Sequence, residues 1–153
     1  MLRYGLFLFL GLVGCQTNAI FKESIELPDG KWPIKTTPTF TFEVKDAFQT
    51  YNLYYTIRNT KSYPYYNLYV TRTIIGPDGK SLERKLDELK VANATTGKPT
   101  GTGLGDIYDH KFMFVKQYRF PKPGTYSIKI EQYMRQDPLP EVLSVGLSVE
   151  NSQ

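Results

Sequence analysis

The chain has 153 residues and a formal net charge of +4, from 19 lysines and arginines against 15 aspartates and glutamates, and this length suits one domain with a sizeable core. The positive charges form no run, which argues against nucleic acid as a partner, because nucleic-acid-binding proteins usually carry a clustered basic face. One cysteine and one histidine exclude an intramolecular disulfide and a zinc site built from several histidines.

The amino-terminal segment has the layout of an export signal. Arg3 is its only charge, and an apolar run follows from Tyr4 to Val13, as in a secretory signal peptide. A bilayer span needs about 20 apolar residues, and this run is much shorter. We therefore predict a targeting segment that does not stay in the membrane.

A cysteine follows this apolar run directly. The sequence Leu12-Val13-Gly14-Cys15 resembles the bacterial lipobox, in which the thiol takes a diacylglycerol, the preceding peptide is cut off and the new amine is acylated. The resemblance implies cleavage between Gly14 and Cys15 and a lipid on Cys15; two or more acyl chains hold a protein firmly on a membrane. An ordinary signal that happens to end in a cysteine is the alternative. We expect a signal peptide at 1–14, a lipidated tether at 15–19 and a single domain at 20–153.

Alternating apolar and polar residues dominate the rest of the chain and predict strands. In the clearest example, Phe40, Phe42 and Val44 alternate with polar residues. Eight strands separated by Pro- and Gly-rich turns indicate an all-β, antiparallel β-sandwich, either jelly-roll-like or Ig-like. We expect 51–58 and 65–75 to pair as a hairpin. The eight predicted strands are 20–26, 39–45, 51–58, 65–75, 81–94, 111–120, 125–135 and 143–149.

Segment 81–94 supports two interpretations. Leu82, Leu86 and Leu89 recur at the spacing of an amphipathic helix, whereas Leu89 and Val91 alternate as in a strand. Because the neighbouring segments are all strands, we predict a strand that is entered through a helical turn. The following segment, 94–106, is rich in Thr and Gly and is expected to be a loop.

Several ordered motifs resemble the gliding-motility lipoprotein H family (GldH) of Bacteroidetes. Besides the lipobox, they are Tyr51-Asn52-Leu53-Tyr54, Arg58-Asn59, Tyr63-Pro64-Tyr65-Tyr66-Asn67-Leu68, the run from Gly101 to Asp109, and Glu131-Gln132-Tyr133-Met134-Arg135. The resemblance implies a non-enzymatic envelope lipoprotein that is needed for gliding and linked to the machinery that also supports type IX secretion. It implies as partners the membrane, through the lipid anchor, and other gliding and secretion proteins of the envelope.

The residues after the cysteine bear on the membrane leaflet. Surface-displayed lipoproteins of this group often carry acidic residues there, whereas Gln16-Thr17-Asn18-Ala19 is neutral. This favours an outer-membrane location facing the periplasm.

Five tyrosines are candidates for a partner surface: Tyr54, Tyr63, Tyr65, Tyr69 and Tyr133. We expect them to point outward, where tyrosines often mark interfaces. The same rings would also suit stacking on sugars, which makes a carbohydrate-binding envelope lipoprotein the alternative function. A third interpretation is that they form cross-strand pairs that only stabilise the sheet.

No residue pattern supports an enzyme, a metal site or a cofactor. The glycines of 97–105 lack the spacing and the following helix of a phosphate-binding loop, so we expect them to permit positive φ in a tight loop. A Ca²⁺ site would need the clustered oxygens of Asp87, Glu88, Asp106 and Asp109, for which we prefer turn and capping roles. His110 lacks a nucleophile in an elbow motif, and we expect a solvated or hydrogen-bonded loop histidine. A lipid-anchored hydrolase is therefore the weakest of the functional interpretations.

Overall fold

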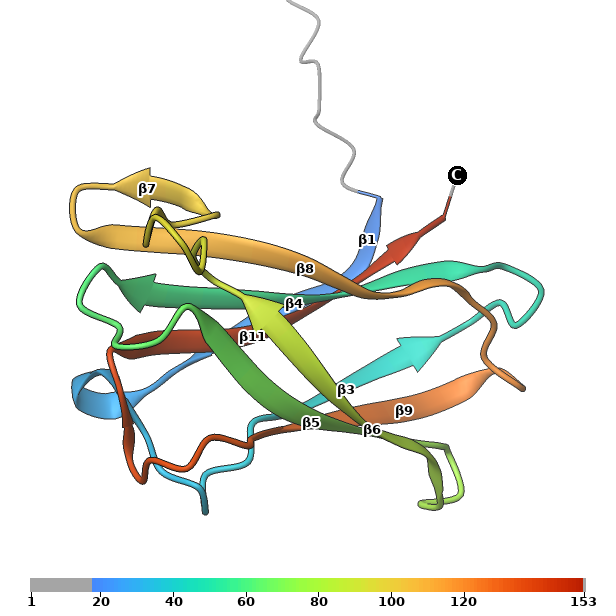
Figure 1. The fold of residues 1–153 in the computed structure, drawn as a ribbon. Helices are drawn as coiled ribbons and strands as arrows, with labels where there is room; N and C mark the ends of the chain where they lie inside the picture. The colour runs from blue at the N-terminus through green and yellow to red at the C-terminus, as the bar shows by residue number, and fades with distance from the viewer. Residues whose placement is uncertain (1–17, 153) are drawn as a thin grey trace, which may run out of the picture.

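The computed structural model describes residues 18–152, which form eleven strands and one short 3-10 turn (Figure 1). Eight of these strands correspond to the eight predicted ones: β1 (Ala19–Glu26), β3 (Thr39–Val44), β4 (Tyr51–Thr60), β5 (Asn67–Ile75), β6 (Ser81–Lys90), β8 (Ile107–Tyr118), β9 (Gly124–Gln132) and β11 (Val142–Asn151). The additional elements are short: β2 (Lys31–Trp32), β7 (Thr102–Leu104), β10 (Leu139–Pro140) and the turn η1 (Pro28–Gly30). The all-β prediction is confirmed.

The strands form two main antiparallel sheets that pack face to face. One has the order β1-β11-β4-β8-β7 and the other β3-β9-β5-β6, while β10 and β2 form a small pair. The predicted hairpin of 51–58 and 65–75 is wrong, because β4 pairs with β11 and β8, whereas β5 pairs with β6 and β9. The apolar sides of β4 and β5 contribute to one core from opposite sheets, so the chain changes sheet between them.

The core lies between the two sheets and is made by the inward residues of every long central strand. Alternation places one side of a strand there, as the burial pattern of β3 shows, and three aromatic rings pack edge to face around Phe120. Its fully buried large side chains include Trp32, Phe40, Leu53, Tyr55, Ile57, Leu68, Ile74, Phe120, Tyr126, Ile128 and Ile130. Burial of each such side chain stabilises the folded state by about 1.5–3 kcal/mol. Packing of this core therefore stabilises the domain without a disulfide.

Within the predicted strand 81–94, residues 81–90 form β6, without the predicted helical turn at its start. Ser81 follows the turn 76–80 directly and already pairs with Ile75. Leu82 and Leu86 point outward and are 44% and 48% exposed, so their helix-like spacing reflects two outward positions on one strand. The predicted loop 94–106 also contains the short strand β7, which pairs with β8.

One charged side chain of β5 lies inside the sandwich, among the apolar residues of the core. Arg72 is 1% exposed and donates to the carboxylates of Asp87 and Glu83 on β6. Tyr55 of the opposite sheet also donates to Asp87, at 2.7 Å, and its pKa is raised by burial and by that carboxylate. The Arg72 guanidinium lies 4.9 Å from the ring centre of Phe114, so the two sheets are joined through a buried ionic network.

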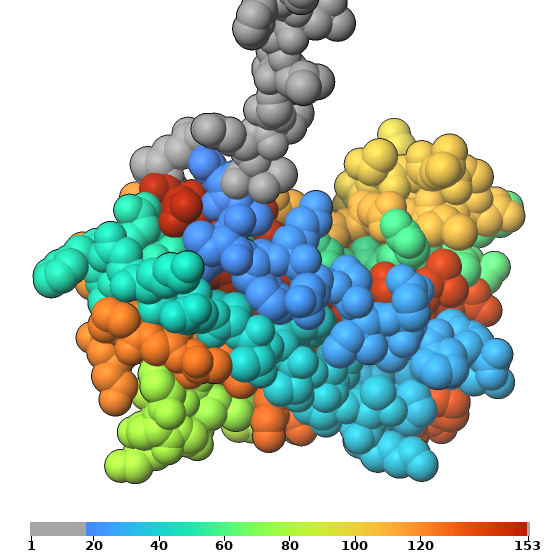
Figure 2. All heavy atoms as spheres, turned by 180° about the vertical axis from the view of Figure 1, so that it is seen from behind, coloured from blue at the N-terminus to red at the C-terminus, as the bar shows by residue number. Residues whose placement is uncertain are grey.

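The two ends of the sandwich differ in what they carry. At one end, which we call the tether end, Asn151 donates its N–H to the carbonyl of Asn18, and Ser152 donates its N–H to the carbonyl of Thr50. The first residues of β1, the β3–β4 segment and the C-terminal residues therefore lie together (Figure 2). The first strand, β1, begins at Ala19. The opposite or far end contains the β4–β5 loop and the turn between β7 and β8 (Figure 1).

Candidate functional site

An apolar hollow of about 360 Å³ opens on the outer face of the β3-β9-β5-β6 sheet, towards the far end. Its position follows from strand register: Leu86 pairs with Thr71 on β5, which brings it diagonally next to Tyr69, within reach of a large side chain. The loop before β5 and the segment after β9 supply the other walls. Its lining residues are Tyr65, Tyr69, Leu86, Tyr133, Met134 and Arg135.

Backbone and side-chain hydrogen bonds hold the walls in place. Tyr133 donates its N–H to the carbonyl of Tyr69 at 2.8 Å, and the Tyr69 N–H points at Met134 Sδ at 3.3 Å. The Tyr65 hydroxyl donates to Gln136 Oε1 at 2.7 Å. The segment after β9 is therefore joined both to β5 and to the loop that precedes it.

Gln132 supports this segment from the core side, a role that its place in the motif 131–135 did not reveal. Its side chain is buried; Oε1 accepts the N–H of Met134 at 2.8 Å, and Nε2 donates to the carbonyl of Gln136 at 3.0 Å. The available signal was its place in β9, since Ile128 and Ile130 put every second residue in the core. The amide of a buried glutamine needs hydrogen-bond partners. Here the partners are backbone groups of the next loop, and these hydrogen bonds hold that loop in its shape.

The rings that line the hollow are accessible from solvent. Tyr133 is the most exposed of them at 64%. The carboxylate of Glu88 raises the pKa of Tyr69 above its ordinary value of 10.0, so this phenol is neutral at physiological pH. The surface therefore offers apolar ring area and phenolic hydroxyls, with the Arg135 guanidinium as its cation.

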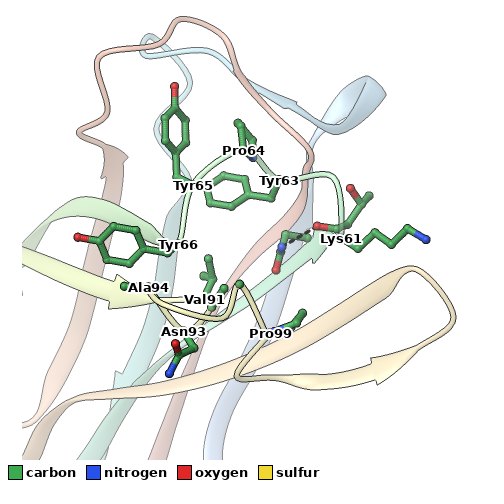
Figure 3. Close-up of a pocket in the computed structure, with 13 residues that line it drawn as sticks. Lys61, Tyr63, Pro64, Tyr65, Tyr66, Val91, Asn93, Ala94 and Pro99 are labelled. Carbon is green, nitrogen blue, oxygen red and sulfur yellow. Dashed lines mark hydrogen bonds between the residues drawn. The ribbon is translucent and has the colours of Figure 1, made fainter.

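A second, smaller hollow of about 200 Å³ lies next to the first one at the far end. Figure 3 shows Tyr63, Pro64 and Tyr65 along one side of it and Val91, Ala94 and Pro99 along the other. Tyr65 lines both hollows, and its ring meets the Tyr63 ring edge to face at 5.8 Å. The β4–β5 loop thus links the two hollows into one surface.

The structure brings together three of the five predicted tyrosines. Tyr65, Tyr69 and Tyr133 share the larger hollow. Tyr63 is only 9% exposed and donates its hydroxyl to the carbonyl of Asn67 at 2.9 Å, so its ring supports the loop and is not available as a contact surface. Tyr54 lies on β4 in the other sheet, where Lys111 Nζ sits 4.2 Å from its ring centre.

His110 lies in a strand, which corrects its placement in a loop. It belongs to β8 and is buried; its Nε2 is 2.7 Å from Asn59 Oδ1, and its ring stacks on Phe112 with centres 5.5 Å apart. Burial lowers its pKa, against a smaller opposing effect of Asp109. Of the two expectations, the hydrogen-bonded histidine is the one observed.

The glycine-rich segment has two separate structural roles. Gly97 and Gly105 have φ values of +70° and +62°, as the prediction of tight turns requires. Gly101 serves close packing, because a Cβ there would come within 2.7 Å of His110 Nδ1. The strand β8 follows this segment, in place of the helix that a phosphate-binding loop needs.

The four acidic residues considered for Ca²⁺ have other partners, and Glu88 accepts a hydrogen bond from Asn67 Nδ2 at 2.8 Å. Asp106 pairs with Lys61 and Asp109 with Arg58, each at 2.8 Å, and Asp87 pairs with Arg72. Within residues 18–152, no group of three acidic, histidine or cysteine side chains is placed to hold a metal ion.

The predicted cleavage and lipidation site, Gly14 and Cys15, lies outside the described residues. Among residues 18–152, no helix combines the length and the apolar character that crossing a bilayer requires.

Comparison with known proteins identifies the family. The family model of the GldH lipoprotein matches residues 19–149. A gliding motility lipoprotein GldH homolog of Christiangramia forsetii is 25% identical, covering 97% of this chain and 96% of the relative. The gliding motility lipoprotein GldH of Flavobacterium johnsoniae is 27% identical, covering 91% and 89%.

Among solved structures, a family GH115 4-O-methyl-alpha-glucuronidase is similar with a TM-score of 0.44 at 12% identity, covering 89% of this chain and 17% of that one. The match of the family model to almost the whole domain confirms the family predicted from the sequence motifs: the chain belongs to the GldH lipoprotein family.

Proposed function

We propose that this protein is a non-enzymatic accessory component of the gliding machinery, also linked to type IX secretion, that binds another envelope protein through the tyrosine-lined hollow. Membership of a lipoprotein family places it at the cell envelope with a lipid anchor. The names of its relatives, gliding motility lipoproteins, support the role in gliding. Attachment at Cys15 and an outer-membrane location facing the periplasm are part of the proposal.

One observation carries the proposal: the tyrosine-lined hollow lies towards the far end of the domain, away from the strand end to which the tether leads. Ala19 lies only four positions after Cys15, a length of chain that spans at most about 14 Å. The tether end is then held near the bilayer, and the hollow faces away from it. A surface in that position is accessible to a partner in the surrounding compartment.

The composition of the hollow favours a protein partner. Tyrosine, methionine and arginine are enriched at the centres of protein interfaces, and all three types line it. Because Gln132 and the Tyr65–Gln136 hydrogen bond hold the walls, a partner loses little binding free energy to ordering them.

The test replaces Tyr65 and Tyr133 by Ala in the full-length lipoprotein and measures colony spreading and secretion of a type IX cargo. Both are expected to fall, because an anchoring tyrosine contributes about 2 kcal/mol, or roughly 30-fold in affinity. Tyr54→Ala is the matched control, since that tyrosine lies on the other sheet, and all variants must reach the membrane fraction in equal amounts. Normal spreading and secretion in the double variant would contradict the proposal.

A photo-crosslinking amino acid identifies the partner directly. Placed at position 133 it is expected to form a defined adduct with one envelope protein, and placed at position 54 it is not. Equal crosslinking at the two positions would show that the hollow is not the binding surface.

Carbohydrate binding is the second candidate function, because the Tyr133 ring is 64% exposed beside the Arg135 side chain. Retention of the wild-type protein on a polysaccharide column, lost in Tyr133→Ala and kept in Tyr54→Ala, would favour it. In that case the crosslinker at position 133 should find no protein partner.

A further inference from the structure

The loops of the tether end carry an exposed phenylalanine surrounded by positive charge. Phe48, in the loop between β3 and β4, is 89% exposed. It lines a hollow of about 550 Å³ together with three basic residues, Lys45, Arg119 and Lys122. Figure 2 shows the β3–β4 segment projecting beside the segment that follows β8. We call Phe48 and these three basic residues the basic loop patch.

The loop that presents Phe48 is held in a defined shape. Asp46 Oδ1 accepts the backbone N–H groups of Phe48 and Gln49, at 2.8 and 3.3 Å, and the Tyr51 hydroxyl donates to the carbonyl of Asp46 at 2.8 Å. Among the residues that the structure describes, Asp46 is also the only acidic one that lines the hollow, and its carboxylate accepts these turn hydrogen bonds. The exposure of Phe48 is therefore a property of an ordered turn.

The three cations of the patch are free to meet an outside partner. All three are exposed, and none takes part in a salt bridge within the part of the chain that the structure describes. An apolar ring among unpaired cations has the chemistry that binds a membrane surface with anionic headgroups.

Hydrogen bonds join the patch to the start of the domain. Gln49 donates from Nε2 to the carbonyl of Ser152 at 3.2 Å, and Ser152 donates its N–H to the carbonyl of Thr50. Asn151, next to Ser152, bonds to Asn18, three residues after Cys15. The patch thus lies on the part of the domain that a lipid at Cys15 would hold within a short distance of the bilayer.

We propose that the tether end docks on the membrane that carries the anchor, with Phe48 in the lipid interface and Lys45, Arg119 and Lys122 against the phosphates of anionic lipids. This proposal rests on the lipid anchor that the proposed function assumes. Docking orients the domain, so the tyrosine-lined hollow points away from the bilayer.

The test uses the full processed lipoprotein in vesicles with brominated acyl chains, which quench tryptophan fluorescence inside the bilayer. Phe48→Trp is compared with Leu104→Trp, a matched control that is 87% exposed in β7 at the far end. The native Trp32 is fully buried, and wild-type protein supplies its background. The vesicles contain phosphatidylcholine with or without phosphatidylglycerol.

Quenching is expected for Phe48→Trp in the phosphatidylglycerol vesicles and not for Leu104→Trp, and it should weaken with added salt. In the Phe48→Trp background, each replacement among Lys45→Gln, Arg119→Gln and Lys122→Gln should lower the docking constant about five-fold. Equal quenching of the two tryptophan variants would overturn the proposal. Quenching that persists after all three replacements would overturn its electrostatic basis and thus the proposal.

Intact-mass analysis of the same samples separates the two proposals. Acyl mass on the chain with an unquenched Phe48→Trp would overturn only the docking proposal. A chain without acyl mass would overturn the anchor on which both proposals rest.

Discussion

At the scale of single residues, the buried guanidinium of Arg72 organises the contact between the two sheets. It occupies an inward position of β5, between Val70 and Ile74, and is neutralised by two carboxylates from the neighbouring edge strand. A buried charge costs several kcal/mol when its partner is lost. The network is therefore more important for stability than a surface ion pair between the same elements.

Asp87→Ala tests this network. The change leaves Arg72 with Glu83 alone and removes the acceptor of the Tyr55 hydroxyl, so the free energy of unfolding should fall by about 3 kcal/mol or more. Urea denaturation measures the loss. The control is Arg84→Ala, which breaks an exposed pair with Glu131 on the outer face and should cost less than about 1 kcal/mol. Similar losses in both variants would contradict a special role for Arg72.

His110 makes the stability of the domain dependent on pH. Burial lowers its pKa below the ordinary 6.5, so the unfolded chain binds a proton at a higher pH than the folded one does. Neutral His110 therefore makes its full contribution to the free energy of unfolding above pH 6.5. That contribution is lost as the pH falls towards the folded-state pKa, and the free energy of unfolding changes by at most about 1.4 kcal/mol per pH unit. Thermal melts of wild type and His110→Gln between pH 8 and pH 5 measure it. A constant difference between the two curves would refute this assignment, because the chain has no other histidine.

At the scale of elements, β11 is the strand that tolerates the least change. It lies between β1 and β4 in the larger sheet, and it is buried on both faces along most of its length. Gly146, in its middle, faces the outer side, where the side chains of Ser24 and Thr56 close over it. Because Gly146 has no Cβ, the hydroxyl groups of Ser24 on β1 and Thr56 on β4 have room to lie over it.

Gly146→Ala is expected to destabilise the domain by about 1–3 kcal/mol through overpacking. The new Cβ would overlap the hydroxyl oxygens of Thr56 and Ser24 and come within 2.6 Å of the carbonyl oxygen of Glu23. The urea midpoint measures the loss. In a Ser24→Ala, Thr56→Ala background part of the stability should return, because only the backbone contact remains. An unchanged urea midpoint for Gly146→Ala would contradict the prediction, because it would show that β1 and β4 accommodate the new Cβ without loss of stability.

At the scale of the whole molecule, the sandwich has two chemically different ends. The tether end carries the basic loop patch, and the far end carries the tyrosine-lined hollow. The two proposals use this polarity together, since a domain docked by one end presents the other to its surroundings. Experiments can nevertheless contradict one proposal without the other. A variant that no longer docks on the membrane but still glides normally would contradict the docking proposal and leave the proposed role of the hollow intact.

Local sequence patterns determined most of the strands and the family. Period-two alternation is clearest where one face of a strand lies in the core and the other is exposed, as Phe40, Phe42 and Val44 of β3 illustrate. The short strands β2, β7 and β10 have two or three residues, too few to show alternation. Segment 81–94 was ambiguous because outward leucines at positions 82 and 86 satisfy a helical spacing as well.

The sequence by itself determined that this is an all-β member of a lipoprotein family, because alternation and motif order are local properties of the chain. Only the tertiary structure decided which strands pair, since β4 and β5 look like hairpin partners until their apolar faces are seen in opposite sheets. It also decided which tyrosines meet: Tyr65, Tyr69 and Tyr133 come from separate segments, and Tyr63 is buried beside them. Such contacts depend on strand register and loop packing between residues far apart in the chain, which no local pattern encodes.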